Sequence, residues 1–263
     1  MLKILQTRLH QGHRTTKFPL EIPALPERFR GRPTIDQAKC SPQCQQCVDA
    51  CPTSALSIVP VENGATKREL RLDLGKCVFC TECVDICPTG AIAYTKDHRL
   101  ATSTREDLIL SGDQLKLAEG LGQQITSRLG RALRLREVAA GSCNACDLDT
   151  NVLNTVGWDL SRFGIAFVAS PRHADGLLVT GAISENMRYA VRDAYDAVPA
   201  PKIVIALGAC AISGGPYAGS PATHNGLGDG SILPVDLFIP GCPPHPLTIL
   251  DGLLRLIHRI PKG

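Results

Sequence analysis

The sequence predicts two structural units in series, a cysteine-rich α+β unit followed by an α/β unit with a mostly parallel sheet. Two cysteine motifs of the same pattern, each followed by a short apolar run, indicate the first unit. Apolar runs that alternate with helical patterns indicate the second. We expect an extended segment over residues 1–33, the cysteine-rich unit over 34–100, a linker with an amphipathic helix over 101–136 and the α/β unit over 137–263.

The segments around the cysteine-rich unit have distinct compositions. Residues 1–33 contain several prolines and scattered charge, which favours a segment that lies extended against a larger body. In the linker, leucine or isoleucine recurs every fourth residue between Asp113 and Glu137. This spacing predicts a helix whose apolar stripe packs on another surface. The stripe consists of Leu117, Leu121, Ile125, Leu129 and Leu133.

Two compact cysteine groups, each ending in Cys-Pro-Thr, form the repeat. They are Cys40, Cys44, Cys47 and Cys51, and Cys77, Cys80, Cys83 and Cys87. In bacterial ferredoxins with two [4Fe–4S] clusters, such a run gives three thiolates to one cluster and the fourth to the other. The sequence therefore predicts a bacterial-type 2[4Fe–4S] ferredoxin domain. One cluster would be held by Cys40, Cys44, Cys47 and Cys87, and the other by Cys77, Cys80, Cys83 and Cys51.

Two details of this repeat bear on its structure. Three residues separate Cys40 from Cys44 where two are usual, so Cys40 is the ligand that departs from the pattern. The apolar runs Ala55–Val59 and Ala91–Tyr94 can pair with each other as strands that cover the clusters. Zinc, which also takes four cysteines in Cys-x-x-Cys pairs, is the alternative ligand for these groups.

The α/β unit is predicted from strand-length apolar runs that alternate with helical patterns. The expected strands are Glu137–Ala140, Gly164–Ala169, Gly176–Val179, Lys202–Leu207 and Val235–Ile239. The expected helices are Asp149–Asn154, Glu185–Ala197 and Pro246–His258. This alternation predicts a flavodoxin-like domain with helices on both faces of the sheet.

The remaining cysteines lie just after three of these strands. Cys143, Cys210 and Cys242 each follow an expected strand, and Cys146 completes a Cys-x-x-Cys turn. Because the loops at the carboxyl ends of parallel strands form the ligand site of an open α/β sheet, four thiolates can meet there. We expect a third [4Fe–4S] cluster on Cys143, Cys146, Cys210 and Cys242, with buried free cysteines as the alternative. Gly208–Gly215 lacks a following Lys-Ser or Lys-Thr, so a phosphate-binding loop is poorly supported.

Composition restricts the partners and the compartment. A formal net charge of +3 and an aromatic content of 4% argue against nucleic acid as a partner. The first residues lack the apolar core of a signal peptide, and the apolar run Ile203–Ile212 is about half the length that spans a bilayer. We therefore expect a protein of the reducing cytoplasm, with its cysteines as metal ligands. The basic cluster Arg128, Arg131, Arg134 and Arg136 is either a solvated helix face or a docking patch for a partner or anionic lipid.

Four segments of the C-terminal unit resemble the small electron-transfer subunit shared by respiratory complex I and group 4 membrane-bound [NiFe] hydrogenases. They are Gly141-Ser-Cys-Asn-Ala-Cys-Asp147, Ala169-Ser-Pro-Arg-His-Ala-Asp175, Gly208-Ala-Cys-Ala-Ile-Ser-Gly-Gly215 and Pro240-Gly-Cys-Pro-Pro244. The N-terminal unit, with its start Met1–Gln6 and the stretch Phe29–Pro33, resembles the two-cluster ferredoxin subunit of formate hydrogenlyase and hydrogenase-4. The chain is thus similar to two neighbouring subunits fused into one.

This resemblance implies that Cys143, Cys146, Cys210 and Cys242 hold the proximal cluster, which faces the catalytic large subunit. Complex I members have two adjacent cysteines at the first position, whereas Cys143 and Cys146 are spaced as in the hydrogenase branch. The implied function is an electron-transfer subunit of an oxidoreductase, without bond chemistry of its own. It would connect a donor, such as ferredoxin or a formate dehydrogenase module, to a [NiFe] hydrogenase-type large subunit.

The resemblance also implies membrane-arm partner subunits and a cytoplasmic location, peripheral on the inner face of the cell membrane. The equivalent subunit of a complex I-like quinone oxidoreductase, or a zinc-stabilised scaffold, are the alternatives. Asp147 lies where complex I relatives place a functional acid, although it could equally cap a helix. Asp149 and Glu185 could relay protons or be solvated carboxylates. His173 and His245 are better explained as hydrogen-bonded loop residues than as ligands, and Trp158 and Tyr195 as packing residues.

Overall fold

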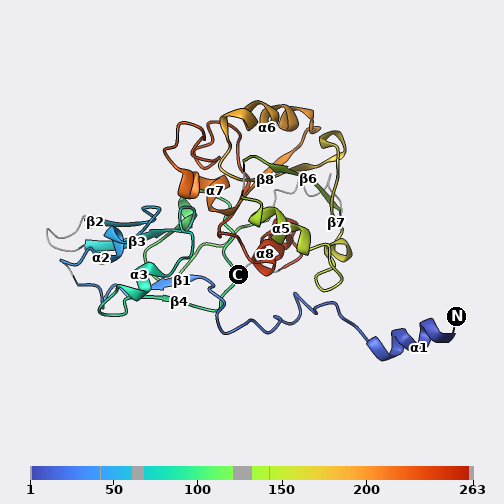
Figure 1. Ribbon diagram of the computed structural model, residues 1–263, viewed down its shortest axis with the longest axis horizontal. Coiled ribbons are helices and arrows are strands. Elements are labelled where there is room, and N and C mark those ends of the chain that lie inside the picture. The colour runs from blue at the N-terminus through green and yellow to red at the C-terminus, as the bar shows by residue number, and fades with distance from the viewer. Residues whose placement is uncertain (1, 42, 61–67, 121–131, 142, 261–263) are drawn as a thin grey trace.

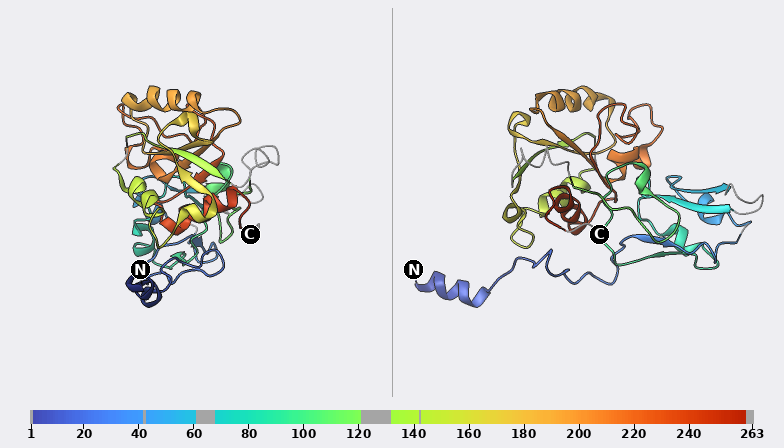
Figure 2. Two further views of the ribbon diagram at one scale, coloured as in Figure 1. Left: turned by 90° about the vertical axis from the view of Figure 1, so that its right-hand side faces the viewer. Right: turned by 180° about the vertical axis from the view of Figure 1, so that it is seen from behind.

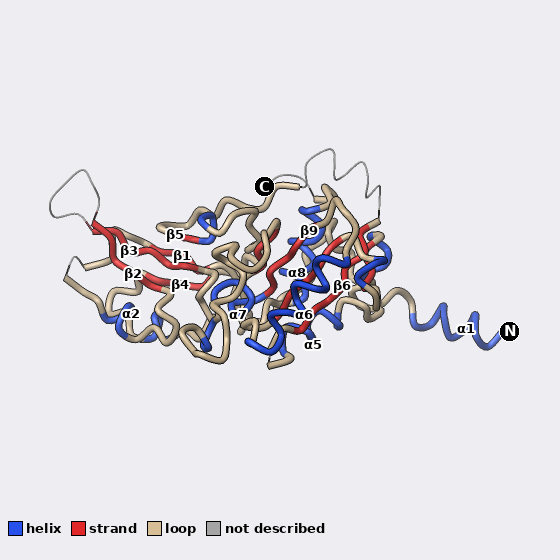
Figure 3. The backbone as a smooth tube through the Cα atoms, turned by 90° about the horizontal axis from the view of Figure 1, so that it is seen from above, coloured by secondary structure: helices blue, strands red, loops and turns tan. Residues whose placement is uncertain are grey.

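The computed structural model describes residues 2–41, 43–60, 68–120, 132–141 and 143–260. The cysteine-rich domain lies at one end of the molecule and the α/β domain in the middle, while helix α1 (Leu2–Gln11) projects at the other end (Figure 1). The view from above shows the same order along the long axis (Figure 3).

The cysteine-rich domain contains two small antiparallel sheets. Strand β1 (Pro33–Ile35) pairs with β4 (Ile92–Tyr94), and β3 (Arg68–Asp73) pairs with β2 (Leu56–Pro60) on one side and β5 (Ile109–Leu110) on the other. The short helices are α2 (Gln46–Asp49), α3 (Glu82–Asp85) and the 3₁₀ turn η1 (Glu106–Leu108).

The prediction that the two apolar runs pair with each other is wrong. Both runs form strands, β2 and β4, but they belong to different sheets. Each of these strands forms its hydrogen bonds with a different partner: β2 pairs with β3, and β4 pairs with β1 through Ile92 opposite Ile35. Side chains of both sheets, including Leu70, Leu72 and Ile92, are buried beneath the cysteine motifs.

The α/β domain has a five-stranded sheet in which every pairing is parallel. Its strands are β6 (Leu133–Ala139), β7 (Ile165–Phe167), β8 (Gly176–Thr180), β9 (Ile203–Leu207) and β10 (Leu237–Ile239). The spatial order is β10-β9-β8-β6-β7, which is the flavodoxin-like 2-1-3-4-5 order in chain numbering. The helices are α5 (Ala145–Val152), α6 (Glu185–Ala197), α7 (Gly208–Ser213) and α8 (Pro246–Leu256), with 3₁₀ turns η2 (Leu160–Phe163), η3 (Pro171–His173) and η4 (Gly215–Tyr217).

Both faces of this sheet are buried, as the continuous apolar strands require. On one face, residues such as Leu178, Ile203 and Ile205 pack with α5 and α8. On the other face, alternate residues such as Val179 and Val204 pack with α6 and α7. Figure 1 shows α6 and α8 on opposite sides of the sheet. Because side chains of successive strand residues point to opposite faces, a purely apolar strand can serve two helix layers at once.

The two domains share one apolar core and several polar contacts. Leu72 and Leu74 of the first domain belong to the same buried cluster as Ile212 of the second. Ser213 Oγ donates a hydrogen bond of 2.8 Å to the carbonyl of Gly75. Thr102 pairs with Phe238 beside β10, so the linker extends the edge of the parallel sheet. The relative position of the two cysteine-bearing domains is therefore determined by packing.

Two expectations about the flanking segments need correction. Residues 2–11 form α1 and are not extended, because leucines and helix-favouring polar residues precede the prolines. The prediction of a linker helix over Asp113–Glu137 is wrong for the two parts of this range that the structure describes. Residues 112–120 are irregular and Leu133–Ala139 form β6, where tertiary pairing with β7 and β8 overrides the helical pattern; residues 121–131 lie outside the described part.

The strand assignment also changes the basic cluster. Arg134 and Arg136 lie on β6 rather than on a helix, and Arg128 and Arg131 lie outside the described residues. Within the described part of the chain, no helix is long and apolar enough to cross a membrane.

Candidate metal centres

The first group of thiols, site 1, consists of Cys40, Cys44, Cys47 and Cys87. All four line one cavity, together with the apolar side chains of Leu70 and Ile92. Burial, followed by the negative charges of Cys40, Cys87 and Cys44, raises the pKa of Cys47 to about 11. Site 1 thus contains three cysteines of the first motif and the last cysteine of the second.

The second group, site 2, consists of Cys77, Cys80, Cys83 and Cys51. Burial, followed by the charges of Cys77, Cys80 and Cys51, raises the pKa of Cys83 to about 12. Phe79 and Thr81 both adopt positive φ, which folds the Cys77–Cys83 loop tightly. Burial also raises the pKa of Cys77 to about 11, although hydrogen bonds from the Phe79 backbone and the Tyr94 hydroxyl oppose this rise.

The two Cys-Pro-Thr segments have the same local geometry. The backbone N–H of Ala55 donates to Cys51 Sγ at 3.2 Å, and that of Ala91 donates to Cys87 Sγ at 3.3 Å. The proline after each cysteine turns the chain so that the residue four positions later faces the sulfur. Burial raises the pKa of Cys87, but the hydrogen bonds from Ala91 and Thr89 outweigh it and lower the pKa overall. These donors stabilise a thiolate, which is the form that binds iron.

The third group, site 3, consists of Cys143, Cys146, Cys210 and Cys242, at the carboxyl ends of β6, β9 and β10. Burial, followed by the charges of the other three cysteines, strongly raises the pKa of Cys146. The N–H of Ala209 donates to the carbonyl of Gly241 at 2.9 Å, which joins the loops that carry Cys210 and Cys242. Cys143 and Cys242 are exposed.

Two glycines leave space beside the sulfurs of site 3. A Cβ on Gly208, at φ +87°, would lie 2.7 Å from Cys146 Sγ, and one on Gly215 would lie 2.9 Å from Cys210 Sγ. Larger residues at these positions would displace the thiols. The glycine-rich segment therefore provides close backbone approach to the sulfurs, rather than a phosphate loop.

These donor sets fit iron–sulfur clusters. Four thiols that lie close together disfavour one another's ionisation, because each thiolate raises the pKa of its neighbours. All four become thiolates only when positively charged metal ions lie close to them. Within the described residues, no three His, Cys, Asp or Glu side chains converge as the ligands of one metal ion do. A [4Fe–4S] cluster has a different requirement, because each thiolate binds its own iron atom at a corner of the cube.

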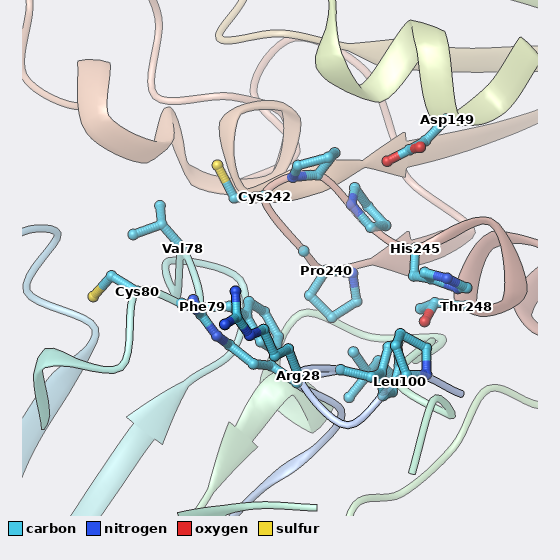
Figure 4. A pocket seen from close by; sticks show the side chains of 16 residues that line it. Arg28, Val78, Phe79, Cys80, Leu100, Asp149, Pro240, Cys242, His245 and Thr248 are labelled. Atoms are coloured by element: carbon cyan, nitrogen blue, oxygen red, sulfur yellow. The ribbon is translucent and has the colours of Figure 1, made fainter. Parts of the chain in front are cut away.

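The three sites follow one another along the molecule. The charge of Cys47 in site 1 contributes to the raised pKa of Cys83 in site 2. Cys80 of site 2 and Cys242 of site 3 line the same pocket, with Val78 between them (Figure 4). Arg30 Nη1 donates to the carbonyl of Phe79 at 2.6 Å at this pocket. Site 2 therefore lies between site 1 and site 3.

A buried carboxyl group, Asp147, and a half-buried one, Glu137, lie near site 3, and only Asp147 was predicted. Asp147 is in the first turn of α5, and its Oδ1 accepts a hydrogen bond of 2.7 Å from Thr180 Oγ1 on β8, so its side chain joins the helix to the sheet. Glu137 was not predicted. Burial and then the charge of Asp147 raise the pKa of Glu137 to about 7. The sequence signal that could have identified it is its place in the alternation Leu133, Leu135, Glu137, which puts the carboxyl group on the same face of the strand as two buried leucines.

The other singled-out residues have ordinary structural contacts. Glu185 pairs with His224 at 2.6 Å and with Arg188 at 3.6 Å. His245 caps α8, since its Nδ1 accepts from the N–H of Leu247 at 3.1 Å. The ring of His245 lies edge-on to Trp158. His173 is exposed on η3, beside Arg172.

Fold and site together define a class of protein: a dicluster ferredoxin domain fused to a flavodoxin-like domain with a further cysteine site. Comparison with family models agrees with this division. Residues 33–91 match the 4Fe-4S dicluster domain, and residues 143–256 match the 20 kDa subunit of NADH ubiquinone oxidoreductase. The chain belongs to this family of oxidoreductase subunits, with the dicluster domain placed before the family's own domain.

Individual relatives lie on both branches of that family. The probable membrane-bound hydrogenase subunit mbhJ of Pyrococcus furiosus is 42% identical over 53% of this chain and 82% of the relative. A NADH-quinone oxidoreductase subunit of Desulfovibrio desulfuricans is 37% identical over 60% of this chain and 86% of the relative. A chain of the membrane-bound sulfane sulfur reductase (MBS), an archaeal respiratory membrane complex, is 29% identical with a TM-score of 0.45, over 52% of this chain and 75% of that one.

Proposed function

We propose that this protein is an electron-transfer subunit that carries three [4Fe–4S] clusters in a membrane-bound hydrogenase complex of the formate hydrogenlyase type. The observation that supports the proposal is the division of twelve cysteines into three groups of four, two of which exchange one member between repeats. Sites 1, 2 and 3 would each hold one cluster. When bound, such a cluster accepts and releases one electron at a potential set by its surroundings.

The chain's own residues would tune these potentials and hold the sites in order. Donors such as the N–H groups of Ala55 and Ala91 stabilise the thiolates and, through them, the more negative oxidation state. Burial acts in the opposite direction on Cys83 and Cys146. Since site 2 lies between the other two, the donor would dock near site 1 and the acceptor near site 3, or the reverse when electrons flow the other way.

The partners follow from this order and from the relatives. The exposed Cys143 and Cys242 at site 3 would face a [NiFe] hydrogenase-type large subunit. A ferredoxin or a formate dehydrogenase module would serve as the electron donor at the other end. Membrane-arm subunits would hold the protein in the cytoplasm at the inner face of the cell membrane.

The second candidate is the equivalent subunit of a complex I-like quinone oxidoreductase. The 37% identity with a NADH-quinone oxidoreductase subunit favours it. The spacing of Cys143 and Cys146 favours the hydrogenase branch instead. Hydrogen evolution by the purified complex supports the first candidate, and quinone reduction without hydrogen chemistry supports the second.

The test of the proposal is an anaerobic purification followed by metal analysis. Three clusters require about twelve irons and twelve sulfides per chain, together with reducible paramagnetic signals. Cys210→Ala should remove about four of these irons and abolish turnover by the complex, while the signals of sites 1 and 2 persist. Colourless protein that contains zinc, or full turnover of the Cys210→Ala complex, would contradict the proposal.

A further inference from the structure

Helix α1 is fully exposed and carries its leucines into solvent. None of its residues is buried, and the side chains of Leu2, Ile4, Leu5 and Leu9 are 61–83% exposed. In the right-hand view of Figure 2 the helix lies away from the body of the molecule. Its side-chain hydrogen bonds are local, such as that from Thr7 Oγ1 to the carbonyl of Lys3. Monomeric surfaces rarely leave such a group of leucines uncovered, so another surface covers this helix.

The leucines and the basic residues of α1 are arranged around the helix in a regular way. Leu2, Leu5 and Leu9 are spaced by three and four residues and share one face. At 3.6 residues per turn, Lys3 and Arg8 lie on either side of that face. Long basic side chains at the edges of an apolar face can extend toward charged groups while the leucines are buried.

The charge of this region has one sign. Between residues 2 and 20 there is no acidic residue, whereas Lys3, Arg8, Arg14 and Lys17 are basic. The first acidic residue, Glu21, pairs with Lys17 at 3.0 Å. The complementary surface must therefore be anionic as well as apolar.

The apolar exposure continues beyond the helix. The chain is fixed to the α/β domain where the N–H of Thr16 donates to the carbonyl of Gly157 and where the Phe18 side chain is buried. After this anchor, Leu20 is 90% exposed and Ile22 is 63% exposed. The exposed apolar residues thus lie on a helix on one side of the anchor and on a turn and the residue after it on the other.

We propose that residues 2–22 bind the surface of an anionic phospholipid bilayer, with α1 parallel to the membrane plane. Leucines beside cations, with no acidic residue before Glu21, match lipid tails beneath anionic headgroups. A groove on a protein would accept one helix face, whereas here the exposed apolar residues lie both on a helix and on a turn beyond the anchor, with the cations before that turn. A fluid surface accommodates both. The ten residues of α1 are too few to span a bilayer, so the contact is peripheral.

This proposal concerns a surface remote from the cysteines and goes beyond the proposed electron transfer. It is tested by flotation of the purified, oxygen-protected full chain with vesicles of phosphatidylcholine alone and of phosphatidylcholine with phosphatidylglycerol. The wild type should float with the anionic vesicles only, and added salt should release it. The double variant Leu5→Glu, Leu9→Glu should lower the partition coefficient by roughly tenfold or more. Lys3→Gln with Arg8→Gln should lower it by roughly tenfold and remove most of the salt dependence.

A matched control separates this effect from general surface hydrophobicity. Tyr189 on α6 is also a large exposed side chain on a helix, 68% exposed, and Tyr189→Glu should leave flotation unchanged. Because α1 contributes nothing to the core, all variants should keep the thermal stability and iron content of the wild type. Wild-type protein that does not float, or a Leu5→Glu, Leu9→Glu variant that floats normally, overturns the proposal. If the isolated variant chain floats like the wild type but the variant complex loses its membrane subunits on purification, α1 binds a protein groove instead.

Discussion

Replacing Gly208 by alanine tests whether the glycine-rich loop makes room for the thiol of Cys146. Gly208 has φ +87°, and an added Cβ would lie 2.7 Å from Cys146 Sγ. The strain of positive φ costs about 2 kcal/mol. Forcing the sulfur and Gly208 apart adds about 2 kcal/mol, as for other overpacked sites. The sum should lower the unfolding midpoint by roughly 12 °C in a chain of this size.

Gly219→Ala is the matched control. Gly219 has a similar φ of +80°, but no atom lies within 4 Å of its added Cβ. This variant should bear only the backbone cost of about 2 kcal/mol, or roughly 6 °C. Gly208→Ala should in addition lose or alter the paramagnetic signal assigned to site 3, while Gly219→Ala retains it.

The assay combines thermal unfolding under oxygen-free conditions with iron analysis and the spectra of reduced protein. Equal midpoints for the two variants, with an unchanged site 3 signal in Gly208→Ala, would refute the steric argument. A loss of the signals of sites 1 or 2 in Gly208→Ala would also speak against it, since the nearest atoms to the added Cβ belong to Cys146, Gly241 and Pro244 and not to a cysteine of either site.

Two further predictions concern the contacts between and around the domains. Arg105 donates to both carboxylate oxygens of Asp73 at 2.8 and 2.5 Å with only 20% of its side chain exposed, so Arg105→Met should cost about 2 kcal/mol in thermal or denaturant unfolding. Arg71→Met, which removes a 45% exposed arginine from Glu69, should cost less than about 1 kcal/mol, and equal losses would contradict the prediction. The second prediction is that His98 makes stability fall below pH 6.5, because burial lowers the pKa of His98 and the unfolded chain then binds a proton that the folded chain does not. His98→Leu should therefore show a smaller drop in unfolding midpoint between pH 7.5 and 5.5 than the wild type, and an identical drop would exclude His98 as its source.

Most of the α/β domain could be predicted because its signals are local. Helix α6 has the predicted bounds, Glu185–Ala197, and β8, β9 and α8 differ from their predicted ranges by one or two residues. Near-continuous apolar runs of strand length are typical of parallel strands that are buried on both faces. The helices predicted between them then cover those two faces of the sheet. Their parallel pairing follows from the crossovers, since each strand is followed by a helix or turn before the next.

The linker shows where local periodicity fails. The four-residue spacing that ends at Leu133 has the period of a helix, but Leu133 and Leu135 are fully buried in β6 between β7 and β8. Strand β6 pairs with residues 32 positions away on β7 and 41 positions away on β8, and no local pattern of the sequence indicates such distant pairing. Glu137 on the same strand was overlooked for this reason, because its unusual environment depends on Asp147 of α5.

The amino-acid sequence alone determined which residues could serve as ligands, because cysteine spacing within one loop limits which thiols can reach a common centre. It also determined the parallel sheet whose carboxyl ends carry site 3. Only the tertiary structure decided the order of the sites, since the pocket shared by Cys80 and Cys242 exists only after the two domains have packed together. It alone decided that α1 stands uncovered, because burial depends on neighbours that are distant in the chain.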